Sequence, residues 1–98
     1  MFRLSFGVAV LAGLLPACAT VQVGGFDLYE DRWKSDSLEV KTRAAFDFHC
    51  PAENLTVTPL GVLSGYRNYA GQIGVEGCDQ QSVYVSTLSG WIQNSQSK

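Results

Sequence analysis

The first strong hydrophobic feature of the chain is an uncharged, mostly apolar run from Leu4 to Leu15, preceded by a single positive charge at Arg3. A helix needs about 20 apolar residues to cross a bilayer, so this run is too short to do so. No later segment of the sequence has a longer run. A short basic start followed by such a run is typical of a secretory signal peptide. We therefore expect residues 1–17 to be a cleaved signal peptide and the protein to be exported.

Two cleavage sites fit the end of this segment. The sequence LPAC at 15–18 matches the lipobox of bacterial lipoproteins, apart from an unusual proline, and predicts a lipidated Cys18 as the mature N-terminus. Alternatively, Ala-Cys-Ala at 17–19 is an A-x-A site, and cleavage before Thr20 releases a soluble protein. We favour the lipobox, and with it a protein held by its lipid on a bacterial membrane. Ala19 after the cysteine, in place of aspartate, favours the outer membrane, with the domain facing the periplasm or the cell surface.

The pattern of residues 34–49 fits two elements. With a period of two, apolar and polar residues alternate cleanly from 38 to 48, as in a half-buried strand. With the helical period, Val40, Ala44 and Phe48 lie on one face. The pattern alone therefore leaves helix and strand open.

Local signals at both ends favour the helix. Asp36 is a candidate N-cap, and Glu39 follows it at the spacing of a capping box. Pro51 disfavours helical backbone at Cys50. We therefore expect a helix that begins near Asp36 and ends before Cys50. Its expected packing residues are Val40, Phe46 and Phe48.

Short strand-like segments follow the helix, separated by turn residues. Residues 61–71 contain several glycines and are expected to form a long turn or hairpin loop. In the third strand-like segment, Val83, Val85 and Thr87 are expected to share one face. The expected strands cover residues 54–60, 72–77, 82–88 and 91–94.

Strands joined by local turns form an antiparallel meander, whose apolar face needs a cover. We therefore predict an α+β domain over residues 34–98, with one helix packed on a small three- to four-stranded antiparallel meander. Residues 18–33 precede this domain. Gly24-Gly25 predicts a flexible, lipid-anchored tether, and the aromatic run FDLYEDRW at 26–33 is expected to cover one edge of the core.

Two cysteines remain in the exported domain once Cys18 is set apart. An oxidising compartment and a small core both favour a disulfide between Cys50 and Cys78. The loop that this bond closes is long enough for the chain-entropy model to give a stabilisation of about 3.6 kcal/mol. We therefore expect the bond to join the end of the helix to the turn after the second strand.

A set of motifs around these cysteines resembles a group of small exported lipoproteins of myxobacteria-like Gram-negative bacteria. The motifs are AAFDFHCP at 44–51, GVEGC at 74–78, the Tyr-Val strand at 84–85 and the ending WIQNS. The resemblance implies a lipid-anchored module and transfers no activity. The chain departs from the pattern at Asp79, where a glycine is usual, and at Ser86, where some members have another cysteine.

Charge and composition exclude several classes of function. The net charge of the full chain is −2, without a basic cluster for nucleic acid or anionic lipid. Cys50, Cys78 and His49 fall short of the four ligands of a zinc site and have no C-x-x-C spacing. A disulfide also removes the thiolate that a Cys-His nucleophile requires. We therefore predict no enzyme activity, no metal and no cofactor.

The segment SGYRNYA at 64–70 is the best candidate for binding a protein or another envelope component. Tyr66, Arg67 and Tyr69 are residue types that recur at recognition surfaces, here in an expected loop. The alternative is an ordinary hairpin whose tyrosines fold onto the sheet. Our leading hypothesis is a non-catalytic, lipid-anchored binding module. The alternatives are a structural accessory protein of the envelope and a soluble secreted effector or inhibitor.

Overall fold

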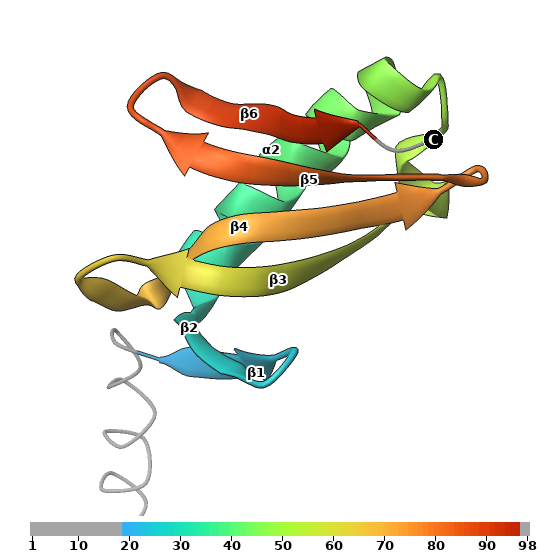
Figure 1. The fold of residues 1–98 in the computed structure, drawn as a ribbon. Coiled ribbons are helices and arrows are strands. Elements are labelled where there is room, and N and C mark those ends of the chain that lie inside the picture. The colour runs from blue at the N-terminus through green and yellow to red at the C-terminus, as the bar shows by residue number, and fades with distance from the viewer. Residues whose placement is uncertain (1–18, 97–98) are drawn as a thin grey trace, which may run out of the picture.

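The computed structural model describes residues 19–96 and shows an α+β domain (Figure 1). The expected signal peptide and the lipobox with Cys18 lie outside the described residues, as does the A-x-A site except for Ala19. The last four strands form an antiparallel meander in the order β3-β4-β5-β6, and β1 and β2 form a separate two-stranded sheet. The elements are β1 (Thr20–Val23), β2 (Phe26–Tyr29), α2 (Glu30–Phe48), η3 (Ala52–Asn54), β3 (Thr56–Leu63), β4 (Tyr66–Gly77), β5 (Gln80–Thr87) and β6 (Gly90–Gln96).

The predicted helix is confirmed, and α2 covers one face of the meander (Figure 1). Its buried residues are Asp36, Val40, Ala44 and Phe48, one turn apart on a single face. The expected N-cap is wrong, because the helix begins at Glu30 and contains Asp36 in its buried face. The Glu30 N–H donates instead to the carbonyl of Ala19, which precedes β1. One of the free donors at the helix start is thereby satisfied by backbone rather than by a side chain.

The helix ends in a Schellman motif. His49 adopts the left-handed conformation, with φ 56° and ψ 50°. The Cys50 N–H donates to the Ala45 carbonyl at 3.0 Å, which is the long hydrogen bond of that motif. Pro51 follows and prevents the helix from continuing. The chain then turns toward the sheet with Cys50 buried.

The core lies between α2 and the meander and corrects one expectation about side-chain direction. Phe46 is 80% exposed, because a position midway between Ala44 and Phe48 lies on the far side of the helix. On β5, Val83 and Val85 share one face as expected, and this face is the one away from the helix, because Tyr84 between them faces α2. The buried hydrophobic residues are Leu28, Val40, Ala44, Phe48, Cys50, Leu55, Ala70, Ile73, Val75, Tyr84 and Trp91.

A hydrogen bond explains why Tyr84 is buried in this core. Its hydroxyl donates to Asp47 Oδ2 at 2.6 Å, so the polar end of the ring has a partner. Burial, together with the hydrogen bond to Asp47 and its charge, raises the pKa of Tyr84. The hydroxyl therefore stays protonated and remains a donor to the helix.

The expected tether and the expected long loop are both wrong. Thr20–Val23 is strand β1, which pairs with β2 through a tight turn at Gly24 and Gly25, whose φ angles are 57° and 90°. The same glycines that suggested flexibility allow this turn, which other residues rarely adopt. Likewise β3 and β4 run through the expected loop at 61–71 to a two-residue turn at Ser64-Gly65. Residues 26–33 are β2 and the first turn of α2, and not only a cover for the core edge.

Candidate binding surface

Three tyrosines and one arginine gather at the end of the domain where β4 begins. Tyr66 and Tyr69 belong to β4, Tyr29 ends β2, and Arg32 lies in the first turn of α2. The Tyr29 and Tyr69 rings meet edge to face with their centroids 5.5 Å apart, and the Tyr66 and Tyr69 centroids are 5.7 Å apart. The Arg32 guanidinium carbon lies 4.7 Å from the centroid of the Tyr69 ring. We call these four residues the tyrosine cluster.

One side-chain hydrogen bond and the ring contacts hold the cluster together. The first residues of β4 lie beside β2, where Asn68 Nδ2 donates to the Asp27 carbonyl at 2.8 Å. This bond fixes the strand that carries Tyr66 and Tyr69 next to the strand that ends in Tyr29. Edge-to-face ring pairs of this kind contribute about 0.5–1.5 kcal/mol beyond the area that they bury. The cluster is therefore an ordered feature of the fold.

Asp36 positions the arginine of the cluster. Arg32 Nε lies 3.1 and 3.2 Å from the two Asp36 carboxylate oxygens, and Asp36 is only 4% exposed. Burial raises the pKa of Asp36 above its ordinary value, and the charge and hydrogen bond of Arg32, with a hydrogen bond from Trp91, offset part of this rise. The carboxylate thus orients the guanidinium over Tyr69 from beneath the surface.

The outer side of the cluster faces solvent. The exposed fraction of Tyr66 is 61%, Tyr29 and Tyr69 are half-buried, and the neighbouring Arg67 is exposed. An aromatic side chain left in water at this level, beside ordered rings and an arginine, is typical of a recognition surface. The cluster therefore offers planar apolar area together with a guanidinium group.

The structure brings together two of the three residues predicted for binding. Tyr66 and Tyr69 lie in the cluster, on a strand rather than on a loop, while Arg32 and not Arg67 stacks on the Tyr69 ring. Tyr69 packs against the fold, as the ordinary-hairpin alternative expects, while Tyr66 stays exposed. Sequence reasoning missed Tyr29 and Arg32. Their only signal was the aromatic density of residues 26–33, which we assigned to the core edge.

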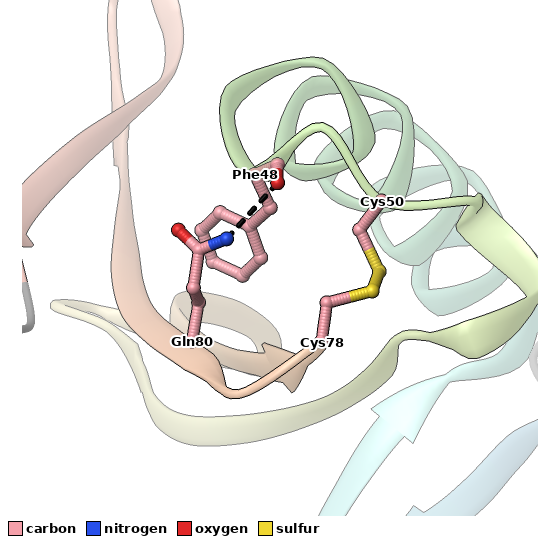
Figure 2. The surroundings of a disulfide bond; sticks show 4 residues. All are labelled: Phe48, Cys50, Cys78 and Gln80. Carbon is pink, nitrogen blue, oxygen red and sulfur yellow. Dashed lines mark hydrogen bonds between the residues drawn. A yellow bond between two sulfur atoms is a disulfide. The ribbon is translucent and has the colours of Figure 1, made fainter.

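The predicted disulfide is confirmed and lies at the opposite end of α2 from the cluster (Figures 1 and 2). The Cα atoms of Cys50 and Cys78 are 6.1 Å apart, within the range that a disulfide spans. Figure 2 shows a second link beside it, where Gln80 Nε2 donates to the Phe48 carbonyl at 2.9 Å. Both links join the end of the helix to the β4–β5 turn.

The same bond occupies both thiols of the described domain, so neither is available as a nucleophile or a zinc ligand. His49 is exposed, and its Nδ1 lies 3.4 Å from the Phe46 carbonyl. Within residues 19–96, no group of three or more His, Cys, Asp or Glu residues is arranged to hold a metal ion. In that same range, no helix has both the length and the apolar character that crossing a membrane requires.

Comparison of the chain with family models, with curated proteins and with solved structures finds no match. The tyrosine cluster is therefore interpreted from its own geometry.

Proposed function

We propose that the protein is a lipid-anchored, non-catalytic binding module of the bacterial envelope. The tyrosine cluster is the observation that carries this proposal, because it joins ordered aromatic rings and a positioned guanidinium on a solvent-facing surface. Tyrosine and arginine dominate the energetics of many binding surfaces. Tyrosine also presents a large contact area at a small cost in side-chain entropy.

The lipid anchor rests on the sequence. An apolar run at 4–15 is followed by LPAC at 15–18, and the domain that follows contains an oxidised cysteine pair. A disulfide fits an exported protein, since reducing compartments rarely keep such bonds. The same features fit a structural accessory protein, and a secreted effector or inhibitor fits the A-x-A site. These alternatives differ from our proposal in two measurable ways, which are attachment to the membrane and binding by the cluster.

Replacing the expected lipidation site is expected to release the protein from membranes. Cys18→Ser removes the thiol that carries the lipid and leaves Ala-Ser-Ala at 17–19, which still fits the A-x-A pattern. The variant should therefore be cut before Thr20 and move from the membrane pellet to the soluble fraction. The matched control is Ala17→Gly, which keeps a small residue before Cys18 and should stay in the pellet. Identical fractionation of Cys18→Ser and the natural protein contradicts the anchor.

Replacing the exposed residues of the surface is expected to reduce binding with little loss of stability. Tyr66→Ala/Arg67→Ala removes two exposed side chains and one tilted ring contact to Tyr69, so the melting temperature should fall by only a few degrees. The fraction of Cys18→Ser protein that sediments with isolated envelopes should fall when these two changes are added. Phe46→Ala is the matched control, because it removes an exposed aromatic ring outside the cluster. It should leave sedimentation unchanged.

Tyr69 is expected to behave differently from its exposed neighbours. Its ring contacts Tyr29, Tyr66 and the Arg32 guanidinium. Tyr69→Ala should therefore lower the free energy of unfolding by about 1–2 kcal/mol, measured by urea denaturation. A large loss of stability in Tyr66→Ala/Arg67→Ala instead contradicts a role for these two residues in binding.

A further inference from the structure

The described part of the fold begins at Ala19, directly after the expected lipidation site. The Ala19 carbonyl already accepts a hydrogen bond from the helix at Glu30, and Thr20 is the first residue of β1. One residue spans at most about 3.6 Å, so a lipid on Cys18 is attached almost at the surface of the domain. A lipid anchored at this distance holds the adjoining end of the domain against the bilayer, because no length of chain separates the two.

The tyrosine cluster occupies this end. Thr20 pairs with Tyr29 in the small sheet, and the Tyr29 ring contacts Tyr69. Figure 1 shows the β3–β4 hairpin and the start of β1 at the same end of the molecule. Thr20, near the start of the described chain, is therefore linked to Tyr69 through Tyr29 alone. The exposed Tyr66 lies next to Tyr69.

We propose that the tyrosine cluster contacts the headgroup layer of the membrane that holds the lipid, so that the module rests on the bilayer in one fixed orientation. This inference rests on the lipid anchor of the proposed function and names the binding partner of the same surface. Tyrosine is enriched at membrane interfaces, where its ring meets the acyl boundary and its hydroxyl meets water and headgroups. Arginine in the same layer keeps its charge in the polar region while its stem covers apolar area.

The charged side chains at this end of the domain do not favour electrostatic attraction to anionic lipid, so the contact should depend on the tyrosine rings in the headgroup layer. Acidic side chains outnumber basic side chains by one on the segments that form this end, so no net positive field draws the domain to a negative surface. The acidic residues are Asp27, Glu30, Asp31 and Asp36, and the basic residues are Arg32, Lys34 and Arg67. The contact should therefore form on zwitterionic vesicles, and added salt should change it little.

Depth-dependent quenching of tryptophan fluorescence tests the contact. Full-length protein is purified with its lipid and placed in phosphatidylcholine vesicles that contain a brominated phosphatidylcholine with bromine near the headgroup. Tyr66→Trp places an indole in the cluster, and Phe46→Trp places one at a similarly exposed position on the last turn of α2. Subtracting the fluorescence of the natural protein removes the contribution of Trp33 and Trp91. The indole at position 66 should be quenched at least about twofold more than the one at position 46.

Each outcome decides the proposal. Greater quenching at position 66 in the acylated protein supports it, and equal quenching at both positions overturns it while the anchor stands. Mass spectrometry that shows no acyl chain on Cys18 overturns the anchor and this inference together. In a third outcome, quenching in vesicles is equal at the two positions, but in native envelopes the indole at position 66 is protected from quenching by acrylamide. That result assigns the surface to a protein partner and overturns the membrane contact.

Discussion

The Cys50→Ala/Cys78→Ala variant is expected to be about 2–5 kcal/mol less stable than the natural protein and to be degraded in the exported compartment. The bond joins residues that are 28 positions apart, for which the chain-entropy model gives about 3.6 kcal/mol. A domain of this size has only about 5 kcal/mol of stability to lose. The Gln80 bond to Phe48 is a second link at this junction, and one such bond contributes only about 0.5–1.5 kcal/mol.

Urea denaturation with and without a reductant measures this effect. Reductant should lower the denaturation midpoint of the natural protein to about that of the double variant, and it should leave the double variant unchanged. This comparison separates the bond from the packing of the buried Cys50 side chain, which reduction leaves in place. A double variant with the midpoint of the oxidised natural protein contradicts a stabilising role for the bond.

Signals that lie close together in the sequence predicted the fold well. The four-residue spacing of Val40, Ala44 and Phe48 and the restriction by Pro51 identified the helix face and its end. The alternation of apolar and polar residues over 38–48 is equally regular, yet it does not correspond to a buried face. Phe46, one of its apolar positions, is exposed on the far side of the helix. The difference is that strand-like alternation needs a pairing partner, whereas the helix forms its hydrogen bonds locally.

Features that depend on distant partners were harder to predict. Gly24-Gly25 is compatible with a tether and with a tight turn, and only the pairing of β1 with β2 decides between them. The tyrosine cluster joins residues about 40 positions apart, so the aromatic segment at 26–33 and the SGYRNYA segment at 64–70 gave no sign of meeting. Its orienting group, Asp36, carried a capping signal that concealed its burial.

The disulfide between Cys50 and Cys78 is the one distant contact that the sequence predicted. The structure also shows which of two nearby glycines allows the chain to approach closely enough for this bond. The GVEGC motif contains Gly74 and Gly77, which both lie on β4, the strand that leads to Cys78. The motif alone gives the two glycines equal weight. In the structure, the atom nearest to an added Cβ is a backbone atom at Gly77 and the end of a side chain at Gly74.

Gly77→Ala is expected to be strongly destabilising. A Cβ at this position would lie 2.5 Å from the Asn54 carbonyl oxygen and 2.8 Å from Leu55 Cδ2. The nearest of these atoms belongs to the backbone, so β4 or the chain before β3 has to move, at a cost of about 2–3 kcal/mol. The same movement displaces Cys78 from Cys50. We expect a lower denaturation midpoint and a measurable fraction of free thiol, detected by alkylation and mass spectrometry.

Gly74→Ala is the matched control in the same strand. The three atoms nearest to its added Cβ all belong to the Leu60 side chain, with Cδ1 at 3.1 Å, and Leu60 is 48% exposed on the face of the sheet away from α2. Leu60 is free to rotate into solvent, and alanine restricts the unfolded chain more than glycine does. The denaturation midpoint of Gly74→Ala should therefore equal or slightly exceed that of the natural protein, with all of Cys50 and Cys78 oxidised. Equal loss of stability in both variants refutes the close approach at Gly77 as the reason for a glycine there.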